Sequence, residues 1–169
     1  NETNKNVVLI GAGSGITPLV SIAKTALKAE QNTNVYLIYG NRNEESIIFK
    51  EKLIELASQY HGRLTVKHVL SQAENSNTDA IIGRIDAVNT QDILQNWPLN
   101  YATDLFYLCG PNAMMDTVRG VLADAKNVFY EKFNNEATNN IAENEEESLK
   151  AQAIKIKYNG EVYAFEVAP

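Results

Sequence analysis

The segment Val7-Val8-Leu9-Ile10-Gly11-Ala12-Gly13-Ser14-Gly15-Ile16-Thr17-Pro18 decides the fold of this chain. Its four leading apolar residues are typical of a central strand in a parallel sheet, which is buried on both faces. The glycines that follow predict a tight turn into a helix. Thr17 is expected to cap that helix and Pro18 to occupy its first position, where a missing N–H costs nothing.

The glycine turn also predicts a nucleotide site. With no side chains at Gly11, Gly13 and Gly15, a diphosphate could approach the main chain at the positive end of the helix. The spacing GxGxG is not specific, because Ile16 stands where the dinucleotide fingerprint has its third glycine. Methyltransferases that use S-adenosylmethionine have similar glycines, although they carry an acid where this chain has Leu9. An empty tight turn is a further alternative.

Strand and helix patterns alternate along residues 7–133. The expected strands are Val7–Ile10, Val35–Tyr39, Leu64–Leu70, Leu105–Cys109 and Val128–Phe133, and the expected helices are Pro18–Ala29, Phe49–Tyr60, Thr90–Asn96 and Met114–Ala125. This alternation predicts an α/β fold with a Rossmann-like, five-stranded parallel sheet and helices on both faces. Ligands of such sheets bind beyond the carboxyl ends of the strands, which here are followed by residues 11–17, 40–42, 71–72 and 109–112.

The rest of the chain has a different composition. Residues 134–150 carry five Glu against one Lys, a large part of the net charge of −6, and predict an acidic linker. Alternating apolar residues on both sides of Asn159-Gly160 predict a β-hairpin within residues 151–169. A lone hairpin is only marginally stable in water, so it either packs on the main domain or begins another one.

Composition also argues against several classes of protein. A single cysteine allows no internal disulfide and favours a reducing cytoplasm. No apolar stretch is long enough to cross a bilayer, and no basic stripe supports nucleic-acid binding. The two histidines have no Cys or His partners at metal-ligand spacing, so we expect no metal site.

Four segments together resemble the NAD(P)-binding domain of the ferredoxin–NADP reductase family. They are Gly-Ala-Gly-Ser-Gly-Ile-Thr-Pro (11–18), Tyr-Gly-Asn-Arg (39–42), Gly-Arg-Ile-Asp (83–86) and Tyr-Leu-Cys-Gly-Pro-Asn-Ala-Met-Met (107–115). They look most like oxygenase reductases of the phenylacetyl-CoA epoxidase type, which join a flavin domain, a nucleotide domain and a plant-type [2Fe–2S] ferredoxin domain. The resemblance implies that residues 1–133 bind NAD(P)H and that residues 151–169 are the start of such a ferredoxin domain.

The same resemblance implies an activity for a longer parent protein. That protein would take a hydride from NADPH or NADH to FAD and pass electrons through [2Fe–2S] to an oxygenase component. The fragment is expected to bind neither FAD nor the cluster, because the flavin-binding barrel is missing and Cys109 is its only cysteine. By itself it should therefore be inactive.

The resemblance also assigns candidate site residues. Cys109 would lie beside the reacting nicotinamide, although a small buried thiol with no chemical role is the alternative. The candidate nucleotide contacts are Gly11, Gly13, Ser14, Gly15, Thr17, Pro18, Asn41, Arg42, Lys50, Ser71, Gly110, Pro111 and Asn112. Asn112 is also expected to cap the helix that follows it.

Nucleotide preference is less sharply indicated. Arg42 could pair with the 2′-phosphate of NADP or be a solvated surface arginine, and Lys50 matches a phosphate-site lysine. Gln72 replaces a frequent arginine, and Glu44 and Glu45 would repel a phosphate. The sequence favours NADPH only slightly. For Phe49 a core position is favoured over a contact with adenine. A methyltransferase and a non-catalytic nucleotide sensor remain alternative functions.

Overall fold

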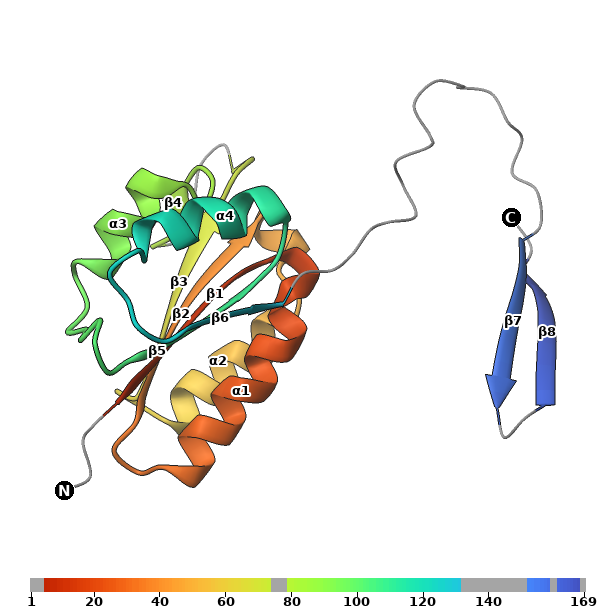
Figure 1. Ribbon diagram of the computed structural model, residues 1–169, viewed down its shortest axis with the longest axis horizontal. Helices are drawn as coiled ribbons and strands as arrows, with labels where there is room; N and C mark the ends of the chain where they lie inside the picture. Colours follow the sequence, from red (N-terminus) through yellow and green to blue (C-terminus); the bar gives the residue numbers. More distant parts are fainter. Residues whose placement is uncertain (1–4, 74–78, 132–151, 159–160, 168–169) are drawn as a thin grey trace. The chain divides into compact units, whose positions relative to one another are not determined.

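The computed structural model describes residues 5–73, 79–131, 152–158 and 161–167, the last two ranges as backbone (Figure 1). The chain divides into two compact units, residues 1–133 and 134–169.

The first unit contains a six-stranded parallel sheet in the order β4-β3-β2-β1-β5-β6. The strands are β1 (Asn6–Ala12), β2 (Asn34–Asn41), β3 (Leu64–Leu70), β4 (Ile81–Ile82), β5 (Leu105–Cys109) and β6 (Val128–Glu131). The predicted parallel α/β sheet is confirmed, but the predicted number of five strands is wrong. The additional strand, β4, has two residues and pairs with the end of β3, so it is too short to produce a periodic pattern in the sequence.

In the part of the first unit that the structure describes, four α-helices cover the two faces of this sheet (Figure 1). Helices α1 (Ile16–Ala29) and α2 (Lys50–Gln59) lie on one face, and α3 (Ala87–Leu94) and α4 (Asn112–Val121) lie on the other. Successive side chains of a strand point to opposite faces. Accordingly, Val7 and Leu9 of β1 pack with α1 and α2, whereas Val8 and Ile10 pack with α3 and α4. The predicted helices on both faces are confirmed.

The starts of two helices differ from expectation. Gly13–Gly15 form a 3-10 turn, η1, so the helical backbone of α1 already begins at Ile16 and its N-cap is Gly15. Thr17 is therefore not the cap: its hydroxyl donates to the Ser14 carbonyl oxygen at 3.0 Å. Pro18 is the third residue of the helix rather than the first.

Helix α4 likewise begins at Asn112, and Pro111 holds the N-cap position without a side-chain hydrogen bond. The prediction that Asn112 caps this helix is wrong. Asn112 is already the first helical residue, whereas a capping side chain belongs to the residue before it.

The direction of the strand order reverses between β1 and β5. From β1 the chain adds β2, β3 and β4 on one side, and then β5 and β6 on the other. Connections leave the two central strands in opposite directions at such a reversal, and α/β sheets bind their ligands at the carboxyl ends of the strands there. The fold thus places the glycine turn after β1 and the Cys109-Gly110 segment after β5 at the position where α/β sheets bind ligands.

The second unit contains two antiparallel strands, β7 (Gln152–Tyr158) and β8 (Glu161–Val167). Tyr158 pairs with Glu161, so the strands have the register of the predicted hairpin. The predicted turn at Asn159-Gly160 and the predicted linker 134–150 lie outside the described residues. Among the residues that are described, no helix has both the length and the apolar character that crossing a membrane requires.

Candidate functional site

The glycine turn packs directly on the end of β5. A Cβ atom at Gly15 would lie 2.2 Å from the Cys109 carbonyl oxygen, and one at Gly11 would lie 2.8 Å from the same oxygen. Both distances are far below van der Waals contact. A side chain at Gly11 or Gly15 would therefore collide with the end of β5, so the packing of the turn on this strand by itself requires glycine at both positions.

Gly13 is the glycine that faces open space. Its φ is +54°, and no atom lies within 4 Å of the position where a Cβ would stand. Ser14 beside it is exposed. The N-cap of α1 has no side-chain hydrogen bond, and the first turn carries no acidic residue. Backbone N–H groups at such an uncapped helix start can bind an anion.

Cys109 ends β5 beside the glycine turn. Its side chain is 1% exposed and belongs to the core beneath α1 and α2. Burial raises the pKa of the thiol, and the negative charge of Glu131 raises it further. The thiol is therefore protonated at neutral pH and is not poised as a nucleophile. This burial agrees with the alternative of a small buried thiol, while the Cys109 carbonyl group lies against the glycine turn.

Asn41, Arg42 and Ser71 come together at the ends of β2 and β3. The Ser71 N–H donates to the Asn41 carbonyl oxygen at 3.0 Å, and the Gln72 N–H donates to the Arg42 carbonyl oxygen at 2.7 Å. These bonds continue the parallel pairing of the two strands. The side chain of Arg42 is exposed and stands where an anionic group could reach it.

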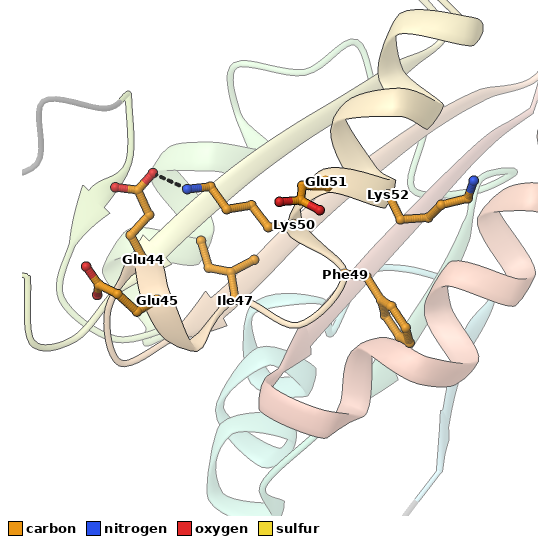
Figure 2. Close-up of a pocket in the computed structure, with 7 residues that line it drawn as sticks. All are labelled: Glu44, Glu45, Ile47, Phe49, Lys50, Glu51 and Lys52. Carbon is orange, nitrogen blue, oxygen red and sulfur yellow. Dashed lines mark hydrogen bonds and ion pairs between the residues drawn. The ribbon is translucent and has the colours of Figure 1, made fainter.

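The segment after β2 forms a small pocket at the start of α2 (Figure 2). Asn43 and Ser46 hold the 3-10 turn η2 (Glu44–Ser46) through a reciprocal capping box, in which each side chain accepts from the other's backbone N–H at 3.1 Å. The pocket has a volume of about 620 Å³ and is lined by Glu44, Glu45, Ile47, Phe49, Lys50, Glu51 and Lys52. Lys50 Nζ lies 2.6 Å from Glu44 Oε1, so the candidate phosphate-site lysine is already paired.

Phe49 lies in this pocket rather than in the core. It is 45% exposed and has a left-handed backbone with φ of +60°. Figure 2 shows its ring pointing away from the Glu44–Lys50 pair. The predicted core position of Phe49 is wrong. Phe49 is the N-cap of α2, and the buried apolar stripe of this helix begins only at Leu53. A bulky residue in the left-handed region is strained, which is often a mark of a functional segment.

Three contacts around the site escaped the sequence-based predictions. The Tyr39 hydroxyl donates to the Gly13 carbonyl oxygen at 3.1 Å, so a residue of β2 holds the glycine turn. Ile85 packs closely against Gly40, and Asp86 caps α3 by accepting from the Asn89 N–H at 2.8 Å. Tyr39 and Gly40 lie in the segment Tyr-Gly-Asn-Arg (39–42), and Ile85 and Asp86 lie in Gly-Arg-Ile-Asp (83–86). Both segments entered the sequence-based predictions only as evidence of a family resemblance.

Within the parts of the chain that the structure describes, no group of three or more His, Cys, Asp or Glu side chains is arranged to hold a metal ion.

A parallel α/β sheet with a glycine turn at its strand-order reversal defines a nucleotide-binding class of domain. Residues 9–120 match the family described as "Oxidoreductase NAD-binding domain", and the chain belongs to this family. The resemblance to the NAD(P)-binding domain of ferredoxin reductases is thereby confirmed.

Relatives of known activity include reductases of oxygenase systems. The chain is 36% identical over 144 residues to one of the subunits of 1,2-phenylacetyl-CoA epoxidase of Escherichia coli (strain K12), a match covering 81% of the chain and 39% of the relative. It is 34% identical over 166 residues to the ferredoxin reductase component of 3-ketosteroid-9-alpha-monooxygenase of Rhodococcus rhodochrous, covering 92% of the chain and 44% of the relative. The chain thus spans about two-fifths of the length of these relatives.

Solved structures show the same fold. The CS-b5R domains of human Ncb5or in the NAD+ form align with a TM-score of 0.65 and 27% identity, over 75% of this chain and 36% of that one. The cytochrome b5 reductase domain of Ulva prolifera nitrate reductase aligns with a TM-score of 0.65 and 21% identity, over 77% of this chain and 51% of that one. None of these relatives favours the methyltransferase or the sensor alternative.

Proposed function

We propose that residues 1–133 are the NAD(P)H-binding domain of a longer reductase that supplies electrons to an oxygenase. The observation that carries the proposal is the junction of β1 and β5, where Gly11 and Gly15 contact the Cys109 carbonyl group and leave Gly13 open beside an uncapped helix start. The dinucleotide diphosphate would lie against Gly13, Ser14 and the first turn of α1, which contains Thr17 and Pro18.

The remaining candidate contacts fall on either side of this junction. The adenosine half would extend over the ends of β2 and β3, towards Asn41, Arg42, Ser71 and the pocket that contains Phe49 and Lys50. The nicotinamide half would extend over Gly110, Pro111 and Asn112, with Cys109 as the neighbour of the reacting ring. When bound, a reduced nicotinamide supplies a hydride.

In this proposal, other parts of the longer protein bind FAD and the [2Fe–2S] cluster. Residues 134–150 would be a linker, and β7 and β8 would be the first strands of the ferredoxin domain. The match to the Rhodococcus rhodochrous reductase component supports this, since it includes 92% of the chain and so extends beyond the first unit. An oxygenase would be the electron acceptor and the cytoplasm the compartment, in keeping with the single buried thiol. Residues 1–169 alone would bind nucleotide without catalysing its oxidation.

A charge introduced at Gly13 tests the site. Gly13→Asp places a carboxylate where no atom lies within 4 Å, so we expect it to weaken binding of NADH, NADPH and ADP-ribose by at least tenfold in calorimetric titrations of the chain. Gly62→Asp is the matched control, because Gly62 also has positive φ and open surroundings but precedes β3. Wild-type chain that binds none of the three ligands, or equal effects of the two substitutions, would contradict the proposed function.

We propose that the site binds NADPH slightly more tightly than NADH. Arg42 is the supporting residue, because Glu44 already neutralises Lys50. The same titrations decide the matter: NADH or ADP-ribose binding at least as tightly as the 2′-phosphorylated forms would show that the preference is wrong.

A further inference from the structure

Tyr39 is a buried titratable residue to which the proposed function assigns no role. It lies on β2, its side chain is fully buried, and its ring packs in the core beneath α1 and α2. The polar end of the ring reaches the glycine turn, where the hydroxyl donates to the Gly13 carbonyl oxygen at 3.1 Å. A core phenylalanine would fill the same space, so the hydroxyl group needs a separate explanation.

The carbonyl group that Tyr39 contacts determines how the turn presents its N–H groups. Gly13 O also accepts from the Ile16 N–H, so both donors fix its direction. The C=O and N–H groups of one trans peptide point in opposite directions. Because Gly13 and Ser14 share that peptide, a Gly13 carbonyl turned towards Tyr39 directs the Ser14 N–H away from the core. Gly13 itself has a left-handed φ of +54°, which a glycine adopts without strain.

The surroundings of Tyr39 keep its hydroxyl group protonated, so that it can donate a hydrogen bond. Burial raises the pKa of the phenol, and this effect exceeds the opposing influence of the Asn41 side chain and the Ile48 N–H. The phenol is therefore neutral across the physiological range and donates to Gly13 O throughout it.

We propose that Tyr39 is a positioning residue for dinucleotide diphosphates, acting through the Gly13–Ser14 peptide. The inference rests on the proposed function and adds a residue that need not touch the ligand. It predicts an effect confined to ligands with a diphosphate, because the Ser14 N–H lies at the turn and not at the adenosine pocket.

Tyr39→Phe is the variant that tests this, because it keeps the ring and removes only the donor. Losing one hydrogen bond that orients the turn should weaken ADP-ribose binding by about 3- to 10-fold. Binding of adenosine 2′-monophosphate, which has no diphosphate, should change by less than about twofold. Tyr36→Phe is the matched control, because Tyr36 is on the same strand but packs on the opposite face with Trp97; it should leave both affinities unchanged.

An amide spectrum gives a second readout that a purely structural role would not alter. In 15N-labelled chain, ADP-ribose should shift the Ser14 amide signal, and Tyr39→Phe should reduce that shift at saturation. An unchanged ADP-ribose affinity, or equal losses for ADP-ribose and adenosine 2′-monophosphate, would overturn the role of Tyr39 while leaving the proposed function intact. Absence of ADP-ribose binding by the wild-type chain would overturn both.

Discussion

Gly15→Ala tests how tightly the glycine turn is packed on β5. The added methyl group would lie 2.2 Å from the Cys109 carbonyl oxygen, 2.6 Å from the carbonyl carbon and 3.0 Å from the Gly110 nitrogen. Ordinary contact begins at 3.4 Å, so the turn or the strand must move by about 1 Å. β5 cannot easily yield, because it is hydrogen-bonded to β1 on one side and to β6 on the other.

Overpacking of this kind typically costs about 1–3 kcal/mol, and here the obstacle is backbone rather than a flexible side chain. We expect a loss of about 3 kcal/mol in the free energy of unfolding, equivalent to roughly 6–12 °C in Tm. Urea denaturation followed by fluorescence measures it, since Trp97 is the only tryptophan and its ring lies 4.9 Å from that of Tyr36, centroid to centroid, in the first unit.

Gly120→Ala is the control, because Gly120 is in α4 and no atom lies within 4 Å of its Cβ position. The same change in residue type should there stabilise the protein by about 0.5–1 kcal/mol. If the free energy of unfolding of Gly15→Ala lies within about 0.5 kcal/mol of the wild-type value, the close packing of turn and strand is not the reason for a glycine at this position.

Three further perturbations follow from individual contacts. Glu44→Gln should tighten binding of 2′-phosphorylated nucleotides relative to NADH, because Lys50 loses its 2.6 Å ion-pair partner; an unchanged affinity ratio would exclude Lys50 from that subsite. The pKa of His68 is lowered mainly by burial and next by the charge of Lys50, and Glu44 opposes this effect. As the pH falls below about 6.5, His68 therefore binds a proton in the unfolded chain before it does so in the folded one. Stability should therefore decrease on acidification, and His68→Gln should reduce this dependence in urea titrations between pH 5 and 7. Asp104→Ala should cost about 3 kcal/mol or more, because the buried carboxylate accepts from Asn6 and from the Asn100 N–H; a loss below about 1 kcal/mol in urea denaturation would contradict this.

The arrangement of strands and helices was predictable because it follows from local periodicity. Val7–Ile10 and Val35–Tyr39 are continuous apolar runs, and buried parallel strands require them. The order of strand and helix then placed residues 11–17, 41–42, 71 and 109–112 at one edge of the sheet. Helix starts were less predictable, because a 3-10 turn of glycines moved the beginning of α1 ahead of Thr17.

The amino-acid sequence by itself determined the parallel α/β architecture and placed the residues of the predicted nucleotide site at one edge of the sheet. Both follow from side-chain patterns along short stretches of chain. Only the tertiary structure decided that Gly15 is required by the Cys109 carbonyl group, that Tyr39 holds Gly13, and that Phe49 is exposed. Such contacts join residues from different strands and turns. The local sequence pattern around either residue does not indicate that the two are close in space.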